Sequence, residues 1–304
     1  MIDYDSPWKE ALDVFLDAFL ELFIPRAHAE IDWSRQCESL DKELQKITPD
    51  AEGGRRYVDK LVKVWLKSGE EQWVLVHIEV QASEDPKFAW RMYIYNCRLF
   101  DKYNREVASI AVLGDDNPRW RPDRFGYHRW GVHAALQFPV VKLLDYAAKR
   151  RQLEESANPF ATVVLAHLDT LETRQDHGER KERKFRLIKG LFERGWSEKR
   201  IRQLFRLIDW MMALPKPLEH AFWDQVKQFK EEKHMPFITT PERYGRAEGR
   251  SEGIEVALRL KFGASALRLM PEIRAIEDLD KLETILHAIE TAASPEDLRR
   301  IWAR

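Results

Sequence analysis

The segment Trp73–Gln81 leaves this chain few structural choices, because it is strongly apolar and carries polar residues toward its far end. A β-strand repeats every two residues, so His77, Glu79 and Gln81 share one face, while Ile78 and the valines beside it share the other. A carboxylate at the end of an apolar strand costs free energy unless its charge is compensated. A bound metal ion is one candidate for that compensation.

A second strand-like run, Val58–Leu66, precedes this segment and is joined to it by residues 67–72, whose Gly and Ser favour a turn. We therefore expect a β-hairpin. A three-residue loop gives the register in which Asp59 lies opposite Glu79. Directly opposed residues have Cβ atoms about 4.5–5.5 Å apart, so these carboxylates can hold one hard divalent cation between them. A slip of one residue would move Asp59 to the other face.

The spacing of Asp59 and Glu79-Val80-Gln81 resembles the PD-(D/E)XK nuclease superfamily, with Gln in place of the final Lys. Three further segments make the chain similar to the Rpn-type recombination-promoting nuclease and transposase family. They are Tyr4-Asp5-Ser6-Pro7-Trp8-Lys9-Glu10, Arg91-Met92-Tyr93 and the Gly-Arg-rich stretch near residue 245. The similarity covers most of the chain. It implies an α/β fold with a restriction-endonuclease-like mixed sheet flanked by helices, followed by an α-helical C-terminal region.

The resemblance also implies roles for three residues. Asp59 and Glu79 match the acids that bind Mg²⁺ or another hard divalent cation, and Gln81 stands where most members have a Lys that orients the attacking water. An amide can position water but carries no positive charge. That charge must then come from the metal or from a neighbour such as Lys9 or Arg91. The alternative, that both acids are ordinary residues at the end of a sheet, stays open.

A helical pattern covers Ala11–Ile24, with Asp13, Asp17 and Glu21 recurring every four residues. The apolar face of this helix should pack on the sheet. Glu10 lies on the same acidic stripe, and many nucleases of the superfamily that the chain resembles carry an additional acid on their first helix. Glu10 is therefore a candidate catalytic residue, whereas the rest of the stripe is expected to be a solvated face.

A second helical pattern opens at Pro86 and runs to about Tyr103, since proline is favoured at early helix positions. Arg91, Tyr95 and Arg98 form a polar stripe on it. This stripe can face DNA phosphates, or Arg91 can pair with an acid of the core; both interpretations stay open.

The segment Arg174–Arg206 contains twelve Lys or Arg and five Asp or Glu, an excess of seven positive charges. Clustered cations bind phosphates without reading base sequence, so the segment is a candidate DNA-binding surface. Arg183, Lys184 and Arg186 are its expected contacts. Charge-rich helices are also commonly solvated faces, and that alternative remains.

The composition is that of a soluble globular protein: 304 residues, 44% hydrophobic, 33% charged, with a net charge of −1. Any DNA-binding surface must therefore be local. Cys37 and Cys97 fit neither a disulfide framework nor a metal-binding CxxC pair, which favours a reducing compartment. With neither a membrane-spanning run nor a signal-peptide pattern in the sequence, we expect a cytoplasmic location and no membrane partner.

Three regions are expected. Residues 1–165 form the nuclease-like α/β domain, to which the strand-like runs Val107–Leu113 and Ala134–Val141 belong; residues 166–235 form a helical basic region. Residues 236–304 comprise a Gly-Arg-rich connector and a small helical tail, a candidate surface for a homodimer. The glycines near residue 245 allow either a close helix contact or a flexible connector.

Together with these patterns, the resemblance implies a metal-dependent DNA endonuclease, related to transposases, in which Mg²⁺ on Asp59 and Glu79 activates water for phosphodiester hydrolysis. The alternative is a DNA-binding or scaffold protein that keeps the fold without the chemistry. The sequence contains no Gly-rich phosphate loop, HExxH motif or GxSxG motif. This disfavours P-loop nucleotide hydrolysis, zincin peptidase chemistry and α/β-hydrolase chemistry.

Overall fold

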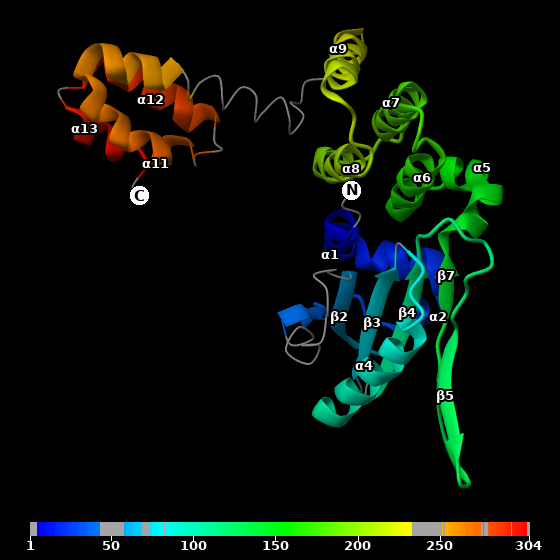
Figure 1. Ribbon diagram of the computed structural model, residues 1–304. Helices are drawn as coiled ribbons and strands as arrows, with labels where there is room; N and C mark the ends of the chain where they lie inside the picture. Colours follow the sequence, from blue (N-terminus) through cyan, green and yellow to red (C-terminus); the bar gives the residue numbers. More distant parts are fainter. Residues whose placement is uncertain are drawn as a thin grey trace. The chain divides into compact units, whose positions relative to one another are not determined.

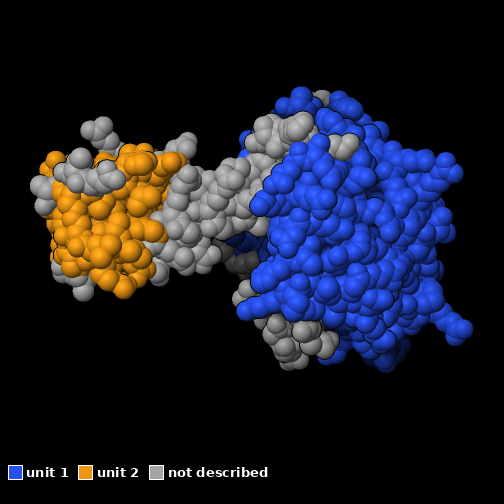
Figure 2. Space-filling model, turned by 90° about the horizontal axis from the view of Figure 1, so that it is seen from above, with its two compact units in different colours: residues 1–232 blue, residues 233–304 orange. Residues whose placement is uncertain are grey.

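A computed structural model describes residues 5–42, 58–68, 73–81, 83–232, 251, 253–274, 276, 279–292 and 294–302. The chain divides into two compact units, residues 1–232 and 233–304 (Figure 2). The helices that follow position 165 belong to the first unit together with the sheet, and the boundary expected there falls inside the helix Pro159–Glu172.

The first unit contains a five-stranded sheet of mixed pairing (Figure 1). Its strands are β1 (Glu38–Ser39), β2 (Val58–Trp65), β3 (Trp73–Gln81), β4 (Val107–Leu113) and β7 (Val140–Lys142). They lie in the order β1-β2-β3-β4-β7. β1, β2 and β3 pair antiparallel, whereas β3, β4 and β7 run parallel. The expected α/β class with mixed pairing is confirmed.

The run Ala134–Val141 forms two strands instead of the expected one. β6 (Val132–Gln137) pairs with β5 (Arg124–Arg129) in a separate two-stranded ribbon, and β7 joins the main sheet. Pro139 stands between β6 and β7. A proline has no N–H to donate to a strand ladder, and its carbonyl oxygen accepts the Ala111 N–H at 3.0 Å instead.

Two helices cover opposite faces of β2. Leu61 packs with Leu99 of α4 (Phe88–Tyr103), whereas the ammonium group of the preceding Lys60 reaches Asp13 of α1 (Asp5–Phe23). Successive residues of a strand point to opposite faces, so α1 and α4 lie on opposite sides of the sheet. The first helix does pack on the sheet, but Asp13 of the acidic stripe, which was expected to be solvated, makes one of its contacts there, whereas Phe19 of its apolar face packs with Phe160.

A group of helices completes the first unit. They are α2 (Pro25–Glu30), η1 (Leu143–Lys149), α5 (Arg150–Glu155), α6 (Pro159–Glu172), α7 (His177–Glu193), α8 (Glu198–Met211) and α9 (Lys216–Glu232). α6 is buried from Pro159 through Thr170 because α1, α5, α7 and α8 all pack against it. Asn158 caps it, since its side chain accepts the Phe160 N–H at 2.8 Å.

A buried histidine of α6 joins α1 to the end of β4. The Nε1–H of Trp8 donates to Nδ1 of His167 at 3.3 Å, and Nε2 of His167 lies 2.9 Å from the carbonyl oxygen of Gly114. An indole can only donate, so Nε2 must carry the imidazole proton. A Cβ at Gly114 would lie 2.8 Å from the His167 ring, which explains the glycine. Burial lowers the pKa of His167 from 6.5 to about 4.

We expect this histidine to make the protein sensitive to acid. Its pKa is depressed in the folded state, so its contribution to stability is complete above pH 6.5. That contribution is lost as the pH falls from 6.5 to 4, by about 3 kcal/mol in total. Urea unfolding at several pH values should show a flatter pH dependence for His167→Gln than for wild type, although the variant is less stable at pH 7. Parallel profiles for the two proteins would contradict this.

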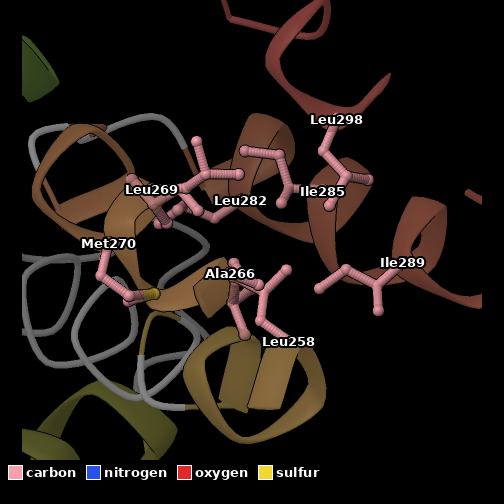
Figure 3. Close-up of a cluster of buried hydrophobic side chains, with 10 residues drawn as sticks. Leu258, Ala266, Leu269, Met270, Leu282, Ile285, Ile289 and Leu298 are labelled. Atoms are coloured by element: carbon pink, nitrogen blue, oxygen red, sulfur yellow. The ribbon is translucent and has the colours of Figure 1, made fainter. Parts of the chain in front are cut away.

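The second unit is helical and has its own core. Beyond a helix over residues 253–262 it contains η2 (Ala264–Leu269), α11 (Met270–Arg274), α12 (Leu279–Thr291) and α13 (Pro295–Arg299). The buried side chains in Figure 3, among them Leu258, Leu282 and Ile285, come from several of these helices. Gly263, with φ of 78°, ends the first of them.

Residues 245–250 of the Gly-Arg-rich stretch lie outside the described residues, as does Tyr4 of the N-terminal motif. Homodimer formation through this C-terminal region therefore stays a prediction. Within the part of the chain that the structure describes, no helix has both the length and the apolar character needed to cross a membrane.

Candidate functional site

The hairpin of β2 and β3 has the register predicted from the sequence. Asp59 pairs with Glu79, and this pair is flanked by Val58 opposite Val80 and Lys60 opposite Ile78. The side chains of Asp59, Glu79 and Gln81 lie outside the described ones, so the register concerns backbone positions. In such a pair the Cβ atoms are about 4.5–5.5 Å apart, which allows two carboxylates to share one cation.

α4 covers one side of the sheet (Figure 1), and the alternation of β2 and β3 assigns positions 59 and 79 to that side. Position 59 is two residues from Leu61, which packs with α4. On the other side of β3, Glu79 is paired with Ala111 of β4, and Ala111 packs with Phe88 and Met92 of α4. Any ligand of the two acids would therefore meet this helix.

The polar stripe of α4 turns inward. Arg91 is only 8% exposed, forms an ion pair with Asp85 just before the helix, and lies 5.5 Å from the centre of the Phe88 ring. Tyr95 is also buried, and Arg98 is half-buried. The pairing of Arg91 with an acid, one of the two interpretations of the sequence, is thus observed. The expectation that the stripe faces DNA phosphates is not met at Arg91 and Tyr95.

A buried ion pair lies at the same edge of the sheet. Because β3, β4 and β7 are parallel, their carboxyl ends meet there: Gln81 pairs with Leu113, and Leu113 pairs with Lys142. The Lys142 ammonium group lies 2.7 and 2.6 Å from the two carboxylate oxygens of Asp115, and both side chains are buried. Sequence reasoning missed this pair, although an acid two residues after the end of a buried strand was a signal for it.

The lysines close to the strand pair are already neutralised. Lys142 is paired with Asp115, and Lys60, next to Asp59, points to the opposite face of the sheet. Its ammonium group contacts Asp13, donates to Asp41 at 2.9 Å and donates to Ser39 at 3.0 Å. Burial lowers the pKa of Lys60, but these two acids outweigh burial and hold it above its ordinary value. Neither lysine supplies the charge that Gln81 lacks.

The candidates on α1 belong to the helix on the other face of the sheet. The Glu10 carboxylate forms an ion pair with Arg206 of α8, which links α1 to the helices of the unit. Lys9 is half-buried in the first turns of α1. The structure therefore gives Glu10 a partner in the helical region, which the acidic stripe in the sequence did not indicate.

The basic segment Arg174–Arg206 is largely paired within the protein. Nine of its twelve cationic side chains make hydrogen bonds or ion pairs with described residues. They are Arg174, Arg180, Lys181, Arg183, Lys184, Lys189, Arg194, Arg202 and Arg206. Several partners, such as Asp116 and Asp169, come from outside the segment. The excess of seven charges is therefore compensated in large part by acids that the segment itself does not contain.

Two of the three expected DNA contacts on α7 need correction. The Lys184 side chain is 2% exposed, lies 2.6 Å from Asp209 and faces the Phe222 ring, so it does not lie on a surface that DNA can reach. Arg183 is held by Glu179, Glu172 and the buried Asp169. Arg186 alone of the three is exposed. A buried charge must be paired, and that requirement overrides the pattern of positive charge along the sequence.

Among the side chains that the structure describes, no three His, Cys, Asp or Glu come together in a group that could hold a metal ion. Asp59 and Glu79 are not in that set. Comparisons of this chain with family models, with curated proteins and with solved structures give no match.

Proposed function

We propose that this protein is a metal-dependent DNA endonuclease whose sheet has the restriction-endonuclease-like arrangement of the PD-(D/E)XK superfamily. The observation that carries the proposal is the pairing of Asp59 with Glu79 near the end of the β2–β3 hairpin. Two carboxylates on neighbouring positions are a donor set that suits Mg²⁺ or another hard divalent cation. A bound cation would supply an activated water and stabilise the charge that develops on the phosphate.

The protein's own residues then have separate tasks. Asp59 and Glu79 would hold the cation, and the Gln81 amide would orient a water molecule by accepting or donating one hydrogen bond. α4 limits the space on this side of the sheet. Ala111 of β4, which is paired with Glu79, contributes a small apolar side chain there. The partly buried Arg91–Asp85 ion pair stabilises the start of α4 over this edge.

A DNA-binding or scaffold protein without catalysis is the second candidate. It is favoured by Gln81, because no described lysine near the strand pair replaces the missing positive charge. The two candidates differ in their response to metal.

The deciding experiment uses the full chain and supercoiled plasmid. We expect nicking with Mg²⁺ or Mn²⁺ and none with EDTA. DNA binding without nicking under any metal would support the second candidate, and an activity that EDTA leaves intact would point to a contaminant or to another chemistry.

Replacing Gln81 with Lys tests the role of the amide. If the absent ammonium group limits catalysis, Gln81→Lys preserves or raises the rate of plasmid nicking, since Lys adds positive charge beside the reacting phosphate. Gln152→Lys, which adds the same charge at an exposed position of α5, controls for general attraction of DNA. A folded Gln81→Lys variant that no longer nicks would show that the amide itself is required.

A further inference from the structure

The ribbon of β5 and β6 ends in a turn whose backbone conformation disfavours the tryptophan that it contains. Arg129 pairs with Val132, so the loop consists of Trp130 and Gly131 alone. Their φ angles are 52° and 84°. This two-residue loop with positive φ at both positions is a type I′ turn, which strongly prefers Asn-Gly. A bulky side chain at positive φ is an outlier that costs free energy.

The same tryptophan is also displayed to solvent. The Trp130 side chain is 92% exposed, the largest value among the exposed large hydrophobic residues of the described chain. Tyr127 and Val132 beside it are exposed as well, and the Arg129 guanidinium lies over the indole ring at 5.7 Å. A strained backbone that presents an exposed ring indicates contact with a partner.

The ribbon differs in charge from the rest of the chain. Residues 124–137 contain two arginines and two histidines but no Asp or Glu, whereas the whole chain has a net charge of −1. Arg124 is paired with Asp123 at the base of the ribbon, while Arg129 lies at its tip. This charge distribution is complementary to a polyanion.

The base of the ribbon is anchored on the helix that covers the candidate site. Tyr93 of α4 lies 5.2 Å from the ring of Phe125 and 6.5 Å from that of Tyr127, measured between ring centres. Leu136 packs against the cluster that contains Phe88 and Met92 of α4. Beyond this base the ribbon extends away from the sheet (Figure 1). Its position relative to α4, and so to the Asp59–Glu79 side, is therefore set by aromatic packing.

We propose that the β5–β6 ribbon binds duplex DNA and that Trp130 at its tip stacks on a base. This proposal rests on the proposed DNA endonuclease function. A two-stranded ribbon fits the major groove, which is about 12 Å wide. Stacking on an aromatic ring needs no particular base, because every base has a π-face. Arg129 neutralises a phosphate beside the stacked base.

The test measures binding of a fluorescein-labelled duplex by anisotropy in EDTA, so that metal-dependent cleavage does not interfere. Trp130→Asn is the decisive variant, because Asn suits the turn and cannot weaken binding by disrupting the hairpin. We expect it to weaken binding by about 5- to 100-fold and Trp130→Phe to retain most of it. Trp210→Ala, which removes another exposed tryptophan, from α8, should bind like wild type.

Two further measurements identify the contact. Arg129→Ala should reduce the slope of log affinity against log salt by about 0.9, the value for one phosphate contact. A duplex containing 2-aminopurine should change its fluorescence on binding wild type, since the base exchanges its neighbours in the duplex for the indole ring, and should not change it with Trp130→Asn.

Each failure has a distinct meaning. Equal affinities of Trp130→Asn and wild type, or no binding of duplex by wild type, would overturn the role of the ribbon even if plasmid is nicked. Loss of a dimer in Trp130→Asn by light scattering, with DNA affinity unchanged, would assign the ribbon to self-association and also overturn it. If DNA binding depends on Trp130 but the protein does not nick plasmid, the DNA-binding role of the ribbon would be supported and the nuclease assignment would be contradicted.

Discussion

Asp59→Asn and Glu79→Gln should each reduce Mg²⁺-dependent plasmid nicking by roughly a thousandfold or more. Each change removes an anionic ligand from a hard cation, and a catalytic metal supplies several kcal/mol of transition-state stabilisation. The measurement is the initial rate of conversion of supercoiled to open-circular plasmid. Wild-type rates in both variants would remove Asp59 and Glu79 from the mechanism.

Thermal unfolding distinguishes loss of metal from loss of fold. The wild-type midpoint should rise with added Mg²⁺, because a ligand that binds only the native state stabilises it, and the two variants should not respond. In EDTA the variants should be at least as stable as wild type, since two like charges placed opposite each other repel. Glu38→Gln is the matched control, because it changes an exposed acid on the neighbouring strand β1.

Asp115→Asn should be the most destabilising single change at the sheet edge, lowering the free energy of unfolding by about 3–5 kcal/mol. It leaves the buried Lys142 ammonium group without its carboxylate, and an uncompensated buried charge is strongly unfavourable. Tryptophan fluorescence during urea denaturation reports mainly on the first unit, since ten of the eleven tryptophans lie in residues 1–232.

Asp116→Asn provides the control for this experiment. Asp116 is the next residue and forms an ion pair with Arg174 at the surface, so its loss should cost no more than about 1 kcal/mol. Adding Lys142→Met to Asp115→Asn should restore much of the lost stability, because it removes the uncompensated charge. If the two single variants were equally stable, the buried pair would have no special importance.

Strands and helices that depend on short-range sequence patterns can be predicted from the sequence. The register of Asp59 opposite Glu79 follows from the alternation of β2 and β3 and from the short loop between them, both of which are local. β4 occupies the predicted residues 107–113, and α4 begins two residues after the expected Pro86. The ribbon was missed because Arg124–Arg129 has only two large apolar residues, Phe125 and Tyr127, and because Pro139 divides the run after it.

The sequence by itself determined the α/β class and which backbone positions of the candidate site become neighbours, since both depend on periodicity over a few residues. Only the tertiary structure decided which charges are available. Lys184 points to Asp209, Arg206 to Glu10 and Lys142 to Asp115, and these partners lie 25, 196 and 27 residues apart. Burial makes such pairing obligatory for a charged group, but no local pattern says which distant acid will provide it.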